Sequence, residues 1–204
     1  MTNDTSSVFE DEKALAVQAV TTPPAYTELY HRYYSRVFNY VRYRCEDLAT
    51  AEDLTALVFE RLLVRIGAYC PDRGPFGAWL FAIARNTVNG HLRTAHRHSW
   101  ISIDLLNQRS GQDVGLEEAA IQKESAADFL KLIEGLGERE RDLLGLKFAA
   151  HFTNRQIAEL TGLSESNVGV ILYRTLSRLR KGFVNKELTL VSLEDRMESS
   201  HGRA

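Results

Sequence analysis

The polar and basic residues near the C-terminus have the types and spacing of a surface that binds DNA. The stretch from Ser164 onward places serine and asparagine first and four basic residues last, at Arg174, Arg178, Arg180 and Lys181. An amide offers a donor and an acceptor to a base edge, whereas cationic groups suit phosphates, which orient a protein without reading sequence. The chemistry indicated is binding, and the chain has no glycine-rich nucleotide-binding loop and no HExxH zinc motif.

A helix-turn-helix is needed to position these side chains, and the pattern predicts one over Thr153–Lys181. Gly162 lies where a short turn needs a positive φ, and Ser164 is placed to cap the second helix. The apolar stripes are Ile157, Ala158 and Leu160, then Val168, Leu172, Thr175, Leu176 and Leu179. In such a motif the second helix enters the DNA major groove. The alternative is an ordinary helical hairpin, because cations also stabilise a helix C-terminus.

Composition and charge limit the class of protein. With 204 residues and a net charge of −2, the chain can hold one or two domains, and any basic surface must be local. Scarce β-branched alternation predicts an all-α fold. No apolar run is long enough to cross a bilayer and no signal peptide is evident, so we expect a cytoplasmic protein without membrane insertion. Cys45 and Cys70 form no metal-type cluster; a disulfide and two unrelated thiols both fit, and a reducing cytoplasm favours the thiols.

The chain divides into two helical modules. We predict a mostly disordered N-terminal arm at 1–22 with a short helical stretch around 11–20, then modules at 23–98 and 124–183. A polar linker at 99–123 joins them, and a weakly helical tail with a frayed end occupies 184–204. The linker is expected to be flexible, so two spaced DNA contacts would increase affinity through effective concentration.

Three helices are predicted in the first module and two more before the helix-turn-helix. The first covers 25–44 with Leu29, Tyr33, Val37, Tyr40 and Val41 on its apolar side. The second covers 51–69, with Thr50 as cap, an acidic first turn, and the stripe Leu54, Leu57, Val58, Leu62 and Ile66. A loop at 70–75 precedes a helix from 76 to about 97, and helices are also expected at 116–135 and 138–149.

The second half of the helix at 76–97 is a further basic surface. Residues 85–98 contain three arginines, three histidines and no acid, and Arg93 and Arg97 share one face. A solvated helix face and a nucleic-acid contact both fit this composition.

Three motifs together resemble a known family. AEDLTALVFERLL, then PFGAWLFAIARNTVNGHLRTAHR, then the helix-turn-helix resemble the extracytoplasmic-function sigma factors of bacterial RNA polymerase, over about residues 25–98 and 124–183. The resemblance implies a transcription initiation factor and not an enzyme, with no cofactor or metal. It implies that the first module grips the polymerase clamp helices and opens the −10 element, and that the last binds the −35 element and the polymerase flap. Many family members also have an anti-sigma factor.

The resemblance also assigns residues in the first module. Polymerase contacts would come from Glu52, Asp53, Leu57 and Glu60. Contacts to the −10 element would come from Tyr69, Arg85, Asn86, Asn89, Arg93 and Arg97. Asn86 matches the asparagine of the family's IARN motif, and Tyr69 has two interpretations, stacking on an unpaired base or packing at a helix end. Phe76 and Trp79 are expected in the core. Ala56-Leu57 departs from the family's usual Gln-Glu and removes polar contacts at the clamp.

In the second module the departure from the family is larger. Contacts to the −35 element would come from Arg155, Ser164, Ser166, Asn167, Val170, Tyr173, Arg174 and Arg178. Val170 and Ile171 stand where the family commonly has basic or polar residues, so they could contact thymine methyl groups or pack on a partner. Two other functions stay open: a stand-alone dimeric helix-turn-helix regulator, and a sigma-like regulator that binds polymerase without recognising promoters.

Overall fold

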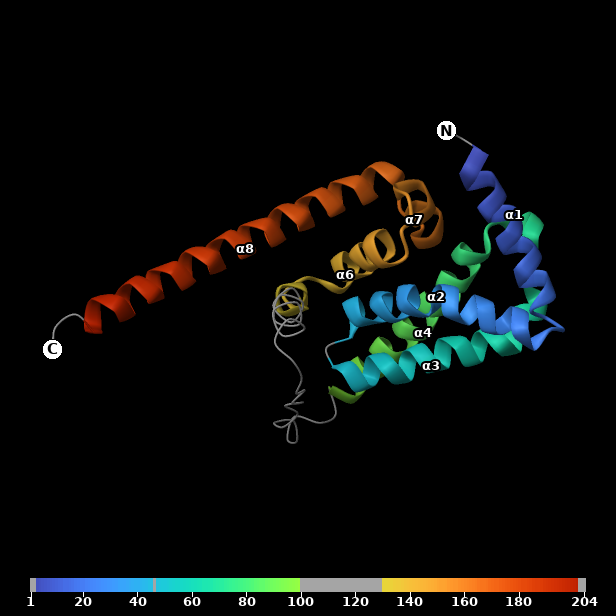
Figure 1. Cartoon of the computed structure of the whole chain (residues 1–204), viewed down its shortest axis with the longest axis horizontal. Coiled ribbons are helices and arrows are strands. Elements are labelled where there is room, and N and C mark those ends of the chain that lie inside the picture. Colours follow the sequence, from blue (N-terminus) through green and yellow to red (C-terminus); the bar gives the residue numbers. More distant parts are fainter. Residues whose placement is uncertain (1–2, 46, 100–129, 202–204) are drawn as a thin grey trace.

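The computed structural model describes the backbone of residues 3–45, 47–99 and 130–201, and the side chains of 11–45, 47–95 and 130–183. Every regular element within these ranges is a helix (Figure 1). The predicted all-α fold is therefore confirmed. The predicted linker at 99–123 and most of the predicted helix at 116–135 lie outside the described residues.

The N-terminal module is built around α2. Its elements are α1 (Asn3–Gln18), α2 (Pro23–Arg44), α3 (Leu48–Arg65), η1 (Ile66–Ala68), η2 (Pro71–Arg73) and α4 (Phe76–Ser99). All five predicted core residues of α2 are buried, and so is the stripe of α3 apart from the half-buried Leu57. The prolines Pro23 and Pro24 occupy the first turn of α2, where a missing N–H costs no helical hydrogen bond.

The start of α3 differs from the prediction. Asp47, not Thr50, is the cap, because its carboxylate accepts a hydrogen bond from the Thr50 N–H at 2.8 Å. The helix therefore begins at Leu48, and Glu52 and Asp53 lie beyond its first turn. Because the helix dipole acts mainly on the first turn, these two acids contribute little to the helix itself.

The prediction of a mostly disordered arm needs correction. Residues Asn3–Gln18 form α1, which packs on α2 and also contacts α4 and η1. Ala16 of α1 and Ala19, just beyond its end, are both buried. Glu12 is buried beside them, and burial raises the pKa of its carboxyl even though Arg36 and Arg32 attract its charge.

The C-terminal module begins with helical residues 130–134 and continues through α6 (Glu138–Leu144), the π-helical η3 (Gly145–Ala149), α7 (Asn154–Thr161) and α8 (Glu165–His201). The helix predicted over 138–149 is thus an α-helix followed by a π-helical turn. The backbone of α8 stays helical through most of the predicted tail and extends away from the other helices (Figure 1).

The two modules pack against each other, which the sequence does not indicate. Helix α6 and η3 lie on α2, and α7 contacts α4. Phe81 of α4 meets Phe152 with ring centroids 5.2 Å apart, and one continuous set of buried residues runs through both modules. Gly145 has no room for a side chain, because a Cβ there would lie 2.8 Å from Cδ2 of Tyr40 in α2.

Candidate nucleic-acid interface

The helix-turn-helix has the local geometry that the sequence predicts. Gly162 takes a left-handed φ of 76° between α7 and α8. The Ser164 hydroxyl caps α8 by accepting a hydrogen bond from the Asn167 N–H at 3.2 Å. Thr153 and Gln156 cap the start of α7 reciprocally, an arrangement called a capping box. Both helix starts and the turn between them are therefore fixed by local hydrogen bonds.

The first turns of α8 separate into a buried and an exposed face. Val168 and Leu172 are buried against the module, whereas Ser166, Asn167 and Arg174 are exposed. Val170 is 43% exposed and Tyr173 is 75% exposed. Leu176, predicted in the apolar stripe, is instead exposed. The outward face of α8 therefore mixes hydroxyl, amide, apolar and cationic groups, the types that contact base edges, thymine methyls and phosphates.

Two of the arginines predicted to contact the −35 element are engaged within the module. Arg178 donates to both carboxylate oxygens of Glu140, at 2.7 and 3.0 Å, and Arg155 pairs with Glu159 at 3.2 Å. Burial alone would raise the pKa of Glu140, but the N–H of Gly137 and the guanidinium of Arg178 outweigh it and hold that pKa below its usual value. Arg178 therefore helps to join α8 to α6 although its side chain is 56% exposed, and Arg174 is exposed as well.

The residues of α4 that are predicted to contact the −10 element differ in their exposure to solvent. Asn86 and Arg93 are exposed and lie nearly two helical turns apart on the same side. Arg85 and Asn89 are half-buried and bonded to other parts of the chain. Arg97 lies in α4, but its side chain is outside the described residues.

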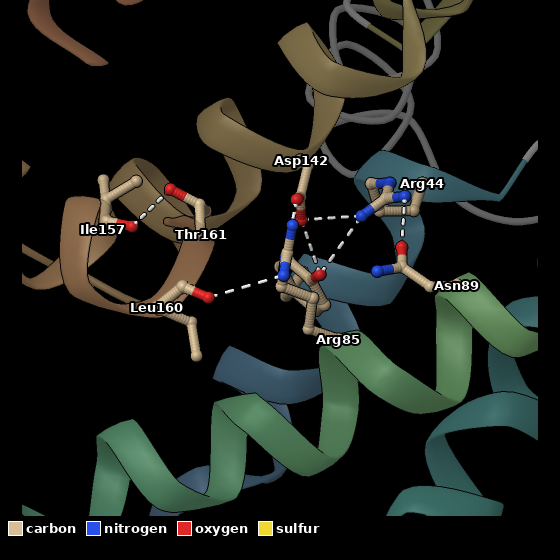
Figure 2. Close-up of polar contacts among 8 residues, drawn as sticks. Arg44, Arg85, Asn89, Asp142, Ile157, Leu160 and Thr161 are labelled. Carbon is tan, nitrogen blue, oxygen red and sulfur yellow. Dashed lines mark hydrogen bonds and ion pairs between the residues drawn. The ribbon is translucent and has the colours of Figure 1, made fainter. Parts of the chain in front are cut away.

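Arg85 and Asn89 are hydrogen-bonded within a buried polar cluster at the boundary between the modules (Figure 2). Asp142 of α6 accepts from Arg44 at 2.6 Å, from Tyr40 at 2.8 Å and, on its other oxygen, from Arg85 at 2.8 Å. Arg44 also donates to the Asn89 side chain at 2.9 Å. Burial, with the neighbouring Asp142 charge, raises the pKa of Tyr40 well above its usual value. We call these five residues the Asp142 cluster.

Sequence reasoning missed this cluster, although a signal for it exists. Arg44 continues the apolar stripe of α2, three residues after Val41 and four after Tyr40. Asp142 directly precedes the buried pair Leu143-Leu144. Charged residues at core positions are rarely buried without a partner, so two opposite charges at such positions suggest a pair. The pattern does not say that the partners lie 98 positions apart.

The loop before α4 holds Tyr69 in a packed position. The Tyr69 hydroxyl donates to the Gly74 carbonyl at 3.0 Å, and its ring lies 5.3 Å from Phe76 and 5.5 Å from Trp79. Phe76 is fully buried, whereas Trp79 is half-buried. This geometry favours the packing interpretation of Tyr69 in the isolated protein.

The predicted polymerase contacts lie along α3. Glu52, Asp53 and Glu60 are exposed, and Leu57 is half-buried. Leu63 and Val64, at the other end of the same helix, are 57% and 80% exposed. Sequence reasoning did not single out this apolar pair, which makes the outer face of α3 acidic at its start and apolar at its end.

The described part of the chain offers little for metal or thiol chemistry. Both cysteines are free, and burial raises the pKa of Cys45 to about 11. Within the described ranges, no group of three histidine, cysteine, aspartate or glutamate side chains could hold a metal ion. Among the helices that the structure describes, none is both long and apolar enough to cross a membrane.

Comparison with known proteins agrees with this architecture. Residues 29–98 match the family model "Sigma-70 region 2", and residues 126–179 match "Sigma-70, region 4". The ECF RNA polymerase sigma factor BldN of Streptomyces coelicolor is 30% identical over 76% of this chain and 60% of its own length. The ECF RNA polymerase sigma factor ShbA of Streptomyces griseus is 35% identical over 63% of this chain and 69% of its own length.

Two solved structures have a similar fold. One is CnrH in complex with the cytosolic domain of CnrY, with a TM-score of 0.61 and 20% identity over 85% of this chain and 97% of that chain. The other is RpoE from Bartonella quintana in complex with the anti-sigma factor NepR, with a TM-score of 0.60 and 19% identity over 76% of this chain and 94% of that chain. Sigma-70 region 2 and region 4 both match this chain, and the two relatives named above are both ECF sigma factors. This chain therefore belongs to the ECF sigma factors of the sigma-70 family.

Proposed function

We propose that this protein directs core RNA polymerase to promoters in the cytoplasm by binding the −35 element with α8 and by recognising and melting the −10 element with α4. The exposed face of α8 carries this proposal. Ser166 and Asn167 offer hydrogen-bonding groups, Val170 offers a methyl surface and Arg174 a cation. All four lie in the N-terminal half of the second helix of the motif, the part that contacts bases in such motifs.

Recognition of the −10 element is assigned to Asn86 and Arg93. Both side chains are exposed on α4, and the Asn86 amide can donate to and accept from the edge of an unpaired base. Arg93 would neutralise a phosphate of the melted strand. Tyr69 joins this site if the captured base displaces the ring from its contacts with Phe76 and Trp79.

Polymerase binding is assigned to the outer face of α3 and, in region 4, to the flap-binding surface of the family. The acids Glu52, Asp53 and Glu60 suit a basic partner, and the exposed pair Leu63 and Val64 adds apolar area that a partner could bury. Such a surface, with an apolar patch beside charges, is typical of a protein interface.

An anti-sigma factor is proposed as a further partner. The two solved structures of similar fold are both complexes, one with CnrY and one with the anti-sigma factor NepR. In this chain Val170, Tyr173 and Leu176 are exposed along α8, so a partner that covered them would also cover the DNA-reading face.

In vitro transcription tests the proposal. The purified protein is added to core polymerase with a library of random promoters, and the transcripts are sequenced. We expect start sites that share two elements at one spacing. A protein that binds DNA as a dimer without polymerase would instead be a stand-alone regulator. A protein that binds polymerase but yields no sequence-selective transcript would be a regulator without promoter recognition.

A further inference from the structure

Gly90 lies in the interior of α4, where glycine is an unfavourable residue. Glycine favours helical structure less than every other residue except proline, because it loses the most backbone freedom on folding. The backbone at this position does not demand glycine, since positive φ among the described glycines occurs at Gly74 and Gly162. Beyond its chain neighbours and the backbone of its own helix, a Cβ at Gly90 would meet no described atom within 4 Å. The described part of the chain therefore leaves room for a side chain at this position.

Two other helical glycines show what an internal reason for glycine looks like. A Cβ at Gly77, near the start of α4, would lie 2.9 Å from the Tyr33 hydroxyl. A Cβ at Gly145 would lie 2.8 Å from Cδ2 of Tyr40. Both positions are closed to a larger residue by the packing of the protein itself. Gly90 faces open space instead, so we look for its reason in what approaches α4 from outside.

The open space at Gly90 lies on the face of α4 that the proposed function assigns to the −10 strand. Gly90 follows Asn86 by four residues and precedes Arg93 by three, so the three positions share one face. Asn86 and Arg93 are both exposed. At 1.5 Å per residue they are about 10 Å apart along the helix axis, with Gly90 between them.

The surface at Gly90 offers close contact and little hydrogen bonding. Its carbonyl already accepts a hydrogen bond from the Thr94 hydroxyl at 3.1 Å, in addition to its place in the helix. The group left for a ligand is the Cα methylene, which carries no charge. Such a surface suits the apolar side of a sugar ring better than a base edge or a phosphate, because both of those need polar partners.

We propose that Gly90 forms a notch on α4 that admits the deoxyribose of one −10 nucleotide, so that the base reaches Asn86 and a flanking phosphate reaches Arg93. This inference rests on the proposed function, which assigns Asn86 to a base and Arg93 to a phosphate. In a nucleotide the sugar lies between base and phosphate, and on α4 Gly90 lies between the residues assigned to those two groups. The missing side chain is thus a determinant of −10 recognition.

A side chain at position 90 would affect the two neighbouring contacts unequally. The Asn86 side chain is short, so a base reaches its amide only when the sugar lies close to the helix. Arg93 is long and flexible and can follow a phosphate that is held further out. Bulk at position 90 should therefore weaken the reading of the base while the phosphate contact remains.

Gly90→Ala and Gly90→Leu fill the notch in two steps. Alanine and leucine both favour helical structure, so each variant should stay folded, with a melting temperature raised by roughly 2–8 °C. Ala95→Leu is the matched control, because Ala95 is exposed on α4 but, five residues on, faces about 140° away from Gly90. A lower melting temperature in both Gly90 variants would show that folding itself needs glycine here, and would overturn the notch.

The test uses holoenzyme formed from each variant and core polymerase. The probe is a fluorescein-labelled single strand that carries the −10 element of a promoter recovered by in vitro transcription from the random library. We expect the affinity for this strand to fall by roughly 5- to 100-fold in Gly90→Leu, by less in Gly90→Ala, and not at all in Ala95→Leu. The salt dependence of binding should stay the same in Gly90→Leu, because no phosphate contact is lost.

A double variant shows whether the notch acts through Asn86. Asn86→Ala should weaken binding in the natural sequence but cost little more in the Gly90→Leu background, where the base no longer reaches the amide. Losses that simply add would overturn this link. Equal affinity of Gly90→Leu and the natural protein would overturn the notch and leave the proposed function standing. A natural protein that yields no selective transcript from the library would overturn both proposals.

Discussion

Removal of the Tyr40 hydroxyl tests whether this group is hydrogen-bonded to Asp142 and shielded from water inside the Asp142 cluster. Tyr40→Phe deletes a donor that lies 2.8 Å from Asp142 and an acceptor that lies 3.2 Å from Arg44. The ring remains, so the edge-on contact with Phe81 at 5.6 Å and the close packing on Gly145 are kept. The change therefore isolates the hydrogen bonds from the apolar contacts.

The expected loss follows from the charge of the acceptor. A hydrogen bond to a charged group contributes about 1.5–3 kcal/mol, against about 0.5–1.5 kcal/mol for a neutral pair. Tyr40→Phe leaves Asp142 bound to Arg44 and Arg85, so it strands no charge and should cost less than the ~3–5 kcal/mol of breaking a buried ion pair. We expect the free energy of unfolding to fall by about 1.5–3 kcal/mol.

Tyr26→Phe provides the matched comparison. Its hydroxyl donates to the neutral Phe59 carbonyl at 2.7 Å, within region 2 alone. We expect a loss of about 0.5–1.5 kcal/mol. Both proteins would be unfolded in urea and followed by far-ultraviolet circular dichroism, with separate transitions fitted if the modules unfold independently. A Tyr40→Phe loss no larger than that of Tyr26→Phe would refute the reasoning, because it would mean that the hydroxyl of Tyr40 is hydrated rather than bound to Asp142.

Four other changes test the assigned surfaces. Asn86→Ala should reduce open-complex formation at the −10 element, measured by permanganate footprinting, with normal polymerase binding; unchanged transcription across −10 variants would contradict this role. Charge reversal of Glu52 and Asp53 to lysine should weaken polymerase binding in pull-down titrations and leave the circular dichroism spectrum intact, because both acids lie beyond the first turn of α3 and do little for the helix. Uracil in place of thymine in the −35 element should weaken binding if Val170 contacts methyl groups, and equal affinity at every position would exclude that contact. Because the pKa of Glu140 is held below its usual value of 4.5, its contribution to stability is present above about pH 4.5 and is lost on acidification; Glu140→Gln should therefore lower the melting temperature at neutral pH, and the difference should vanish in strong acid.

Local patterns alone determined the helices and the turn of the DNA-binding motif. The apolar stripes of α2 and α3, the left-handed Gly162 and the Ser164 cap depend on contacts within a few residues, so spacing and residue type are sufficient to predict them. The family could also be identified from the sequence alone, because its motifs are short and continuous. The start of α3 was predicted wrongly, because Thr50 was expected to cap the helix and the Asp47 side chain caps it instead.

Tertiary structure decided which of the candidate side chains are accessible. Arg85, Asn86, Asn89 and Arg93 look equivalent as members of one polar helix, yet two are bound at the boundary between the modules and two are exposed. The difference comes from Asp142, which is 57 positions from Arg85 and has no periodic relation to it. Hydrophobic spacing specifies the face of a helix that is buried, but not the distant segment that covers it, because that choice depends on the shape and charge of both surfaces together.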